Sequence, residues 1–362
     1  MFSADDSVWM AQALHLAERG LYTTSPNPRV GCVLVRDNQL IAEGWHERAG
    51  EPHAEAHALR IAGAEARGAT AYVTLEPCSH HGRTPPCADA LITAGVARVV
   101  IAMQDPNPQV AGQGIARLRS AGIEVDSGLM EAIACALNPG FIARMTRGTP
   151  WVRSKIAMSL DGRTALNNGE SQWITGAAAR RDGHHWRARS CAVLTGIGTV
   201  LADDAQLTVR DVATTRQPLR VVLDSTLRMS PAARILRGGN ALLYTTSTDQ
   251  RKILTLTEAG AEVVVLPADR GQINLAACLK DLATRGCNEV LLEAGRTMNG
   301  AMLQAGLLDE LLIYLAPQLL GDMARGMAQL GELTRLDQGI TLEWQDVRSV
   351  GKDLRIIANV KK

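Results

Sequence analysis

The chain contains His53-Ala54-Glu55, followed further along by Pro77-Cys78 and then Cys87. One histidine and two thiolates can hold a zinc ion and leave its fourth position for a water, whose pKa falls to about 7 when bound. The predicted metal ligands are therefore His53, Cys78 and Cys87. Glu55 is placed to take a proton from this water and pass it to a departing amine. The order of these residues predicts a zinc-dependent deaminase with Glu55 as its catalytic residue.

Local sequence patterns place these residues on regular elements. Residues 54–62 read as a helix that begins beside His53, and residues 69–75 read as a buried strand that leads to Cys78. His57 lies four residues after His53, as in zinc proteases, but there the glutamate follows the first histidine directly. The protease interpretation therefore fails. The remaining cysteines are interpreted as small buried apolar residues: Cys32, Cys135, Cys191, Cys278 and Cys287.

Strands and helices alternate along the first part of the chain. Helices are predicted from about Ser7 to Gly20, over 88–94 and over 115–121, and strands over 30–35, 40–44, 98–102 and 123–126. This order predicts a three-layer α/β domain, with helices on both faces of a sheet. The pattern breaks at residues 144–150, where Gly148 and Pro150 lie close together. We therefore expect one domain over 1–147 and a second over 148–362.

The second part alternates in the same way and also predicts an α/β domain. Strands are expected at 152–157, 192–195, 219–223, 241–244, 262–266, 289–292 and 311–315, and a closing hairpin at 342–347 and 354–358. Two glycine loops follow predicted strands, at residues 195–199 and 293–301, where backbone N–H groups can hold a phosphate. Neither loop is a dinucleotide fingerprint. On the residues alone, these glycines are as well explained by close packing at a turn.

Composition and charge argue against several classes of protein. The 362 residues are 46% hydrophobic and 21% charged, which is enough for two full cores. Residues 1–147 carry a net charge of −3 and the remainder +4, and only 3% of the chain is aromatic, so a nucleic-acid groove is not expected. No stretch is long and apolar enough for a membrane span, and the start lacks the features of a secretory signal. We expect a cytoplasmic protein, since thiolate zinc ligands suit a reducing compartment.

The spacing of the two cysteines carries a resemblance to a known family. Residues 78–87 read Cys-Ser-His-His-Gly-Arg-Thr-Pro-Pro-Cys, with eight residues between the cysteines where the usual deaminase signature has two. With His-Ala-Glu upstream, this segment closely resembles the deaminase half of the bifunctional deaminase-reductases of riboflavin biosynthesis. Residues 26–33, residues 104–108 and the whole second half are similar to the same family. The resemblance covers essentially all of the chain.

The resemblance implies both fold and activity. It implies a cytidine-deaminase-like domain followed by a dihydrofolate-reductase-like domain, and the cofactors zinc and NADPH. The implied first reaction is hydrolytic deamination of a small molecule, 2,5-diamino-6-ribosylamino-pyrimidin-4-one 5′-phosphate. The implied second reaction is NADPH-dependent reduction of the ribosyl group to a ribityl chain. A homodimer formed through the second domain is expected from the family.

The resemblance also implies residue roles in both domains. In the first domain, Asn27, His46 and Arg83 are expected to contact the substrate. In the second, the substrate would be lined by Ser171, Arg187, Leu207, Arg210 and Glu293, with the arginines serving its phosphate. The residues implied to contact NADPH are Ala157, Trp173, Thr199, Asp203, Ser225, Gly295, Arg296, Thr297, Met298, Asn299, Gly300 and Ala301.

Several alternatives stay open from the sequence. Asn27, between two prolines, can be a turn residue, His46 can be a hydrogen-bonded residue at a strand end, and Arg187 can lie on a solvated helix face. The whole protein can instead be a nucleoside or nucleic-acid deaminase with an appended domain that is not a reductase. A zinc-stabilised protein without catalysis is a further alternative, although Glu55 argues against it. Activity of only one half is also compatible with the sequence.

Overall fold

The computed structural model describes residues 2–79, 86–269 and 271–361, and the chain divides into two compact units, 1–149 and 150–362. This division lies two residues after the boundary expected from the sequence. Helix α6 (Pro139–Arg147) runs through the stretch in which no helix was expected and ends at Gly148, whose φ of 69° lies in the left-handed region. Glycine adopts this conformation at little cost, so the predicted break in the pattern is the end of a helix.

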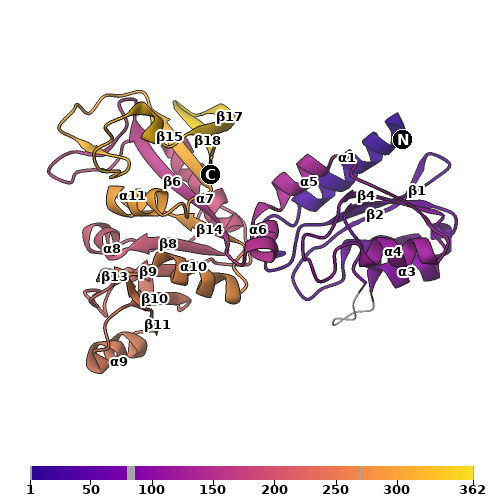
Figure 1. Cartoon of the computed structure of the whole chain (residues 1–362), viewed down its shortest axis with the longest axis horizontal. Helices are drawn as coiled ribbons and strands as arrows, with labels where there is room; N and C mark the ends of the chain where they lie inside the picture. Colours follow the sequence, from indigo (N-terminus) through magenta and orange to yellow (C-terminus); the bar gives the residue numbers. More distant parts are fainter. Residues whose placement is uncertain (1, 80–85, 270, 362) are drawn as a thin grey trace. The chain divides into compact units, whose positions relative to one another are not determined.

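In the described part of the chain, the first unit is a five-stranded sheet with helices on both faces (Figure 1). The strand order is β2-β1-β3-β4-β5; β1 is antiparallel to both of its neighbours, and β3, β4 and β5 are parallel. Helices α1 and α5 pack on one face and α2, α3 and α4 on the other. The bounds are α1 Ala4–Glu18, β1 Gly31–Arg36, β2 Gln39–Trp45, α2 Ala54–Ala62, β3 Thr70–Leu75, α3 Cys87–Ala94, β4 Arg98–Met103, α4 Gln113–Ser120, β5 Glu124–Ser127 and α5 Glu131–Leu137.

Helix α1 begins three residues before the predicted start at Ser7, because a capping box forms ahead of it. The Ser3 hydroxyl accepts the N–H of Asp6 at 3.0 Å, and the Asp6 carboxylate accepts the N–H of Ser3 at 2.8 Å. Two of the otherwise unpaired N–H groups at the start of the helix are thereby satisfied. The helix lies very close to β1, since a Cβ at Gly31 would stand 2.0 Å from the Ala13 carbonyl oxygen.

The second unit, as far as it is described, is built on a nine-stranded sheet in the order β11-β10-β9-β8-β14-β6-β15-β18-β17 (Figure 1). The strands from β11 to β15 are parallel, and the hairpin β17–β18 adds two antiparallel strands at one edge. The bounds of its main elements are β6 Trp151–Ser159, α7 Ala177–Arg189, β8 Ala192–Gly196, α8 Ile197–Asp203, β9 Leu219–Leu223, β10 Ala241–Thr245, α9 Gln250–Glu258, β11 Ala261–Val265, α10 Leu275–Thr284, β14 Glu289–Leu292, α11 Arg296–Gln304, β15 Glu310–Ala316, β17 Leu342–Val350 and β18 Asp353–Val360.

The parallel order of this sheet positions the functional loops. The carboxyl ends of parallel strands lie at the same edge, and ligands bind beyond that edge in open α/β sheets. The loops after β8, β9 and β14 therefore open to one side, where α8 and α11 begin. Most residues of the parallel strands are apolar and buried, as expected for a sheet covered on both faces, although β6 also carries Arg153 and Lys155.

No helix in the described residues is both long and apolar enough to cross a lipid bilayer.

Candidate active sites

Three elements of the first unit bring His53, Cys78 and Cys87 together. His53 is the residue at which α2 is capped, Cys78 follows strand β3 by three residues, and Cys87 is the first residue of α3. Their ligand atoms all lie within 4.8 Å of one another, and no other group of three potential ligands is found in the described residues. The Nδ1 atom of His53 lies 3.7 Å from the Cys78 sulfur and 3.3 Å from the Cys87 sulfur.

These distances fit a tetrahedral zinc site. With Zn–N of about 2.05 Å and Zn–S of about 2.3 Å, a tetrahedral ion sets nitrogen and sulfur ligands about 3.6 Å apart. The hydrogen bond between the two cysteines lowers the pKa of Cys78, which His53 lowers further, and raises the pKa of Cys87. A thiolate is the form that binds metal. The donor set, the spacing and the ionisation of Cys78 all suit zinc with one position left for water.

Glu55 lies in the first turn of α2, beside the three ligands. Its side chain is buried, with 3% of the residue exposed. Burial raises the pKa of Glu55 to about 7, although the charge of His53 lowers it. His53, Glu55 and Cys78 line a cavity of about 270 Å³, which we call the metal pocket. A carboxyl group of this pKa can both accept and release a proton near neutrality.

Asn27 and His46 lie in the same pocket and contact each other. The Asn27 Nδ2 atom lies 3.1 Å from His46 Nε2, and His46 Nδ1 lies 3.1 Å from the Pro52 carbonyl oxygen. These partners assign the proton to Nδ1, so that Nε2 accepts from Asn27 and the amide oxygen of Asn27 stays available. Burial lowers the pKa of His46, which favours this neutral form. The third residue implied to contact this substrate, Arg83, lies outside the described residues.

Glu76 also lines the metal pocket and was not singled out from the sequence. Its buried carboxylate accepts backbone N–H groups from Asp105 at 3.1 Å, Gly112 at 3.0 Å and Ile115 at 3.2 Å. It therefore fixes the segment after β4 against the end of β3. Residues of that segment, Asp105 and Asn107, form one wall of the pocket. The only signal in the sequence was the Glu-Pro pair directly before Cys78.

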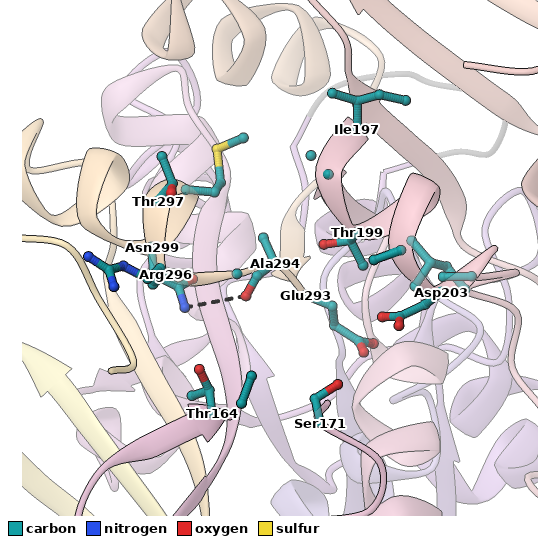
Figure 2. Close-up of a pocket in the computed structure, with 18 of the residues that line it drawn as sticks. Thr164, Ser171, Ile197, Thr199, Asp203, Glu293, Ala294, Arg296, Thr297 and Asn299 are labelled. Atoms are coloured by element: carbon teal, nitrogen blue, oxygen red, sulfur yellow. Dashed lines mark hydrogen bonds between the residues drawn. The ribbon is translucent and has the colours of Figure 1, made fainter. Parts of the chain in front are cut away.

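A much larger cavity, of about 1570 Å³, lies in the second unit at the carboxyl ends of the parallel strands. We call it the large cavity. Figure 2 shows Thr199 and Asp203 of α8 on one wall, and Arg296 and Thr297 of α11 on the opposite wall. The predicted site residues that line it are Ala157, Ser171, Trp173, Arg187, Thr199, Asp203, Leu207, Arg210, Ser225, Glu293, Gly295, Arg296, Thr297, Met298, Asn299 and Ala301.

Two glycines leave space for a ligand, whereas a third is a packing residue. A Cβ added at Gly198 or Gly295 meets no atom within 4 Å, so the backbone at the starts of α8 and α11 is open. These helix starts can receive phosphate groups of a dinucleotide, which fits NADPH. Gly300, in contrast, is not among the lining residues, and a Cβ there would stand 2.1 Å from the Gln329 carbonyl oxygen. Its absence of a side chain serves the packing of α11.

Arg187 and Glu293 form an ion pair in the wall of the large cavity. Arg187 donates to the Glu293 carboxylate from Nε at 2.5 Å and from Nη2 at 2.9 Å, and from Nη1 to the Thr208 carbonyl oxygen at 3.0 Å. The side chains are only 16% and 13% exposed, so the alternative of a solvated helix face is wrong for Arg187. Lys155, which was not singled out from the sequence, lines the same cavity. Burial lowers the pKa of Lys155, although the charge of Glu293 acts to raise it.

Other residues predicted to contact the substrate or NADPH in the large cavity differ in their exposure and contacts. Arg210 is exposed and donates to the Thr208 hydroxyl at 3.3 Å. Leu207 is buried, with a φ of 54°. Trp173 is largely exposed and lies under the guanidinium of Arg180, 4.5 Å from its ring centre. The dashed line in Figure 2 joins Asn299 to the Ala294 carbonyl oxygen, which fixes the first turn of α11.

Comparison with known proteins adds to this geometry. The family model described as cytidine and deoxycytidylate deaminase zinc-binding region matches residues 3–103, and the model described as RibD C-terminal domain matches residues 150–356. The riboflavin biosynthesis protein RibD of Escherichia coli is 51% identical, with 96% of this chain and 98% of that protein covered.

Two solved structures extend the likeness to three dimensions. Acinetobacter baumannii RibD, form 1, has a TM-score of 0.92 at 47% identity, with 99% of each chain covered. The diaminohydroxyphosphoribosylaminopyrimidine deaminase/5-amino-6-(5-phosphoribosylamino)uracil reductase of Thermotoga maritima has a TM-score of 0.85 at 33% identity, again with 99% of each chain covered. The predicted fold class, a cytidine-deaminase-like domain followed by a reductase domain, is confirmed.

Proposed function

The chain belongs to the RibD family of bifunctional riboflavin biosynthesis enzymes, and from this premise we propose which of its residues carry out the two reactions. The protein has a zinc-dependent deaminase domain and an NADPH-dependent reductase domain. The match of a reductase family model to residues 150–356 disfavours the alternative of a deaminase with an unrelated appended domain. We assign the deaminase to residues 1–147 and the reductase to 148–362.

The proposed first reaction replaces an amino group on a pyrimidine ring by oxygen. The substrate is 2,5-diamino-6-ribosylamino-pyrimidin-4-one 5′-phosphate, which with water gives the aminouracil and ammonia. His53, Cys78 and Cys87 hold the zinc ion, which when bound lowers the pKa of a water molecule. Glu55 takes the proton from this water and delivers it to the leaving amine. Its pKa of about 7 suits both steps.

Asn27 and His46 orient the ring in the metal pocket. Their mutual hydrogen bond uses one amide proton of Asn27 and leaves its oxygen and second proton for the donors and acceptors of a pyrimidine edge. Glu76 holds the wall that carries Asp105 and Asn107. Arg83 is proposed as a further substrate contact.

The proposed second reaction reduces the ribosyl group in the large cavity. NADPH, when bound, supplies the hydride for C1′ of the sugar. Its proposed contacts are Ala157, Trp173, Thr199, Asp203, Ser225, Gly295, Arg296, Thr297, Met298, Asn299 and Ala301. The sugar ring opens in this step, so its oxygen must gain a proton. We assign that proton to Lys155, because burial lowers its pKa and so makes the ammonium a better donor.

Arg187 and Arg210 have different parts in this proposal. The guanidinium of Arg187 donates hydrogen bonds to Glu293 and Thr208, so its main role is to hold the Glu293 carboxylate in one position. Arg210 is more exposed and makes one long side-chain hydrogen bond, which leaves donors for the substrate phosphate. Ser171 and Leu207 complete the proposed substrate wall.

We also propose that the protein is a homodimer through its second domain. Strand β17 is the edge of the nine-stranded sheet, and it exposes Trp344 at 63% and Val347 at 56%. An exposed edge with apolar side chains is a surface that a partner strand or sheet can cover. Light scattering of wild type and Trp344→Asp tests this point, with a smaller mass expected for the variant.

The proposed compartment and ligand class follow from other observations. The described cysteines are all free thiols, including two zinc ligands, which suits the reducing cytoplasm. The metal pocket is small and has few aromatic walls, which supports a free pyrimidine ribosyl phosphate and not a nucleic-acid strand.

The single observation that carries this proposal is the placement of buried Glu55 in the same pocket as His53 and Cys78. Mass spectrometry of products from the diaminopyrimidine ribosyl phosphate, with and without NADPH, tests it. We expect exchange of an amino group for oxygen in both reactions and addition of two hydrogens only with NADPH. Unchanged substrate despite full zinc occupancy would favour the non-catalytic alternative.

A further inference from the structure

The loop after strand β9 contributes to the lining of the large cavity and carries cationic side chains. Ser225, Thr226 and Arg228 of this loop line the cavity, as does Arg234 a short way further along the chain. Among the described residues, the guanidinium groups of Arg228 and Arg234 have no hydrogen-bond or ion-pair partner. The guanidinium groups of Arg187 and Arg210, in contrast, have protein acceptors.

The acidic residue at the end of this strand faces away from the cavity. Asp224 is fully buried and is not among the lining residues. Its Oδ2 atom accepts the backbone N–H groups of Arg228 at 2.7 Å and Met229 at 2.8 Å. In dinucleotide sites, an acidic residue after a strand accepts the 2′-hydroxyl of the adenosine ribose in NADH, whereas an arginine accommodates the 2′-phosphate of NADPH. Here the carboxylate folds the loop, and the loop presents Arg228 instead.

Two acidic residues stand at the end of α8, beside the segment that carries Arg234. The carboxylate of Asp204 accepts the backbone N–H of Arg234 at 2.9 Å, so it fixes the segment that carries this arginine. Asp203 is exposed on α8 and is the proposed contact to NADPH. A carboxylate accepts a ribose hydroxyl but repels a phosphate. The 2′-phosphate is therefore expected on the side of the two arginines and the Ser225 hydroxyl.

The opposite wall has a separate cationic position. Arg296 lies at the start of α11, where the open backbone of Gly295 and the N–H groups of the helix are suited to the pyrophosphate (Figure 2). The loop after β9 is therefore the expected position of the 2′-phosphate, which distinguishes NADPH from NADH.

We propose that Arg228 and Arg234 form the 2′-phosphate subsite of the large cavity and give the reductase its selectivity for NADPH over NADH. This proposal rests on the cofactor assignment above. It concerns selectivity alone, because neither residue is part of the proposed catalytic machinery.

Direct binding tests the proposal without turnover. Calorimetry measures the affinity of the full-length protein for 2′,5′-ADP, which carries the 2′-phosphate, and for 5′-ADP, which lacks it. The variants are Arg228→Ala, Arg234→Ala and the double replacement. Arg237→Ala is the matched control, since Arg237 is an exposed arginine close in sequence that does not line the cavity. The described hydrogen bonds of Arg237 use backbone atoms alone: its N–H donates to the Arg234 carbonyl oxygen at 3.1 Å, and its carbonyl oxygen accepts from Arg220 at 2.9 Å. The replacement keeps both.

Loss of one charge-assisted contact to phosphate is expected to weaken 2′,5′-ADP binding by roughly 10- to 100-fold. Affinity for 5′-ADP stays within about threefold, and Arg237→Ala resembles the wild type in both measurements. The ratio of NADPH to NADH affinity falls by the same factor as the 2′,5′-ADP affinity. Equal losses for both nucleotides, or no loss for either, overturn the subsite. A wild-type protein that binds neither NADPH nor 2′,5′-ADP overturns the cofactor assignment itself.

Discussion

Arg187 donates two hydrogen bonds to the carboxylate of Glu293, although 106 residues separate them in the sequence. Burial alone would raise the pKa of Glu293, but the charge and hydrogen bonds of Arg187 outweigh it and lower the pKa to about 2. The carboxylate is therefore ionised at every pH at which the enzyme is expected to work. Its negative charge lies in the wall of the large cavity together with Lys155.

Replacing Arg187 by Met should show that the ionisation of Glu293 depends on this guanidinium. Without the guanidinium, burial dominates and the pKa of Glu293 rises above its ordinary value of about 4.3. If reduction needs ionised Glu293, its rate then begins to fall at a higher pH in the variant than in the wild type as the solution is made more acidic. The measurement is the pH profile of kcat/KM for reduction of the deaminated substrate. An acid limb at the same pH in both proteins would contradict the positioning role of Arg187, and Arg210→Met is the control that removes a charge without touching Glu293.

The zinc ligands should be separable from the other cysteines. Cys78→Ser removes a thiolate from the cluster, and zinc affinity is expected to fall by more than about 100-fold, since even neighbours of metal ligands cost 10- to 100-fold. Deamination is lost with the metal, while reduction of the deaminated substrate persists. Cys135→Ser, which changes a half-buried cysteine outside the cluster, retains zinc. Metal analysis after gel filtration reads this out; equal zinc in both variants would refute the ligand assignment.

The acid stability of the first unit should depend on Asp6. This buried carboxylate accepts from Arg98 at 2.8 Å and 3.2 Å and from the Tyr72 hydroxyl at 2.8 Å. Burial alone would raise its pKa, but these partners and the Ser3 N–H hold the pKa well below its usual range. Because the folded pKa is depressed, the stabilisation is present above the unfolded pKa of about 4 and is lost as pH falls toward the folded value.

Asp6→Asn should therefore cost about 2 kcal/mol in the free energy of unfolding at pH 7, and this cost should shrink below about pH 4. Urea denaturation of both proteins across this range measures the difference. The difference is the proper quantity, because zinc release also destabilises the folded state in acid. Asp5→Asn, at the exposed neighbouring position, serves as the control with no expected effect. A cost that does not change with pH would contradict the ionic origin.

Gly295, which caps the start of α11, and Gly300, inside this helix, should respond in opposite ways to alanine. At Gly300 a Cβ would stand 2.1 Å from the Gln329 carbonyl oxygen, so Gly300→Ala must displace α11 or the 329 segment. Overpacking of this kind costs about 1–3 kcal/mol, which thermal denaturation detects. At Gly295 the space is open and φ is −79°, so Gly295→Ala leaves stability within about 0.5 kcal/mol but weakens NADPH binding. A larger loss of stability in Gly295→Ala than in Gly300→Ala would contradict these two roles.

Much of the fold could be predicted, because the strands of both units are short apolar runs bounded by turns. The predicted strand at 219–223 matches β9, and the helix predicted over 54–62 matches α2. Helices α5 and α6 were not predicted. Gly148 and Pro150 follow α6, and they led us to expect an irregular segment over 144–150. The helix has only nine residues, and a helix this short depends on tertiary packing.

The sites divide in the same way. The proposed zinc ligands could be predicted from residue types and their order, because the chemistry of the metal restricts its ligands severely. Arg187 pairs with Glu293, and the Glu76 carboxylate accepts backbone N–H groups, only because particular loops meet at a sheet edge. The spacing of these residues in the sequence could not reveal either contact. A lysine such as Lys155 on a buried strand has no motif around it, although a charge within an apolar run was a usable signal.

We propose that two separate sites carry the two reactions, and that Glu55 acts in only the first. The most direct measurement gives Glu55→Gln the diamino substrate and the deaminated aminouracil in separate reactions with NADPH, and follows both by mass spectrometry. We predict full zinc content, a loss of deamination of at least about 100-fold, and normal addition of two hydrogens to the aminouracil. Deamination at the wild-type rate, or loss of both reactions with zinc still bound, would contradict the account.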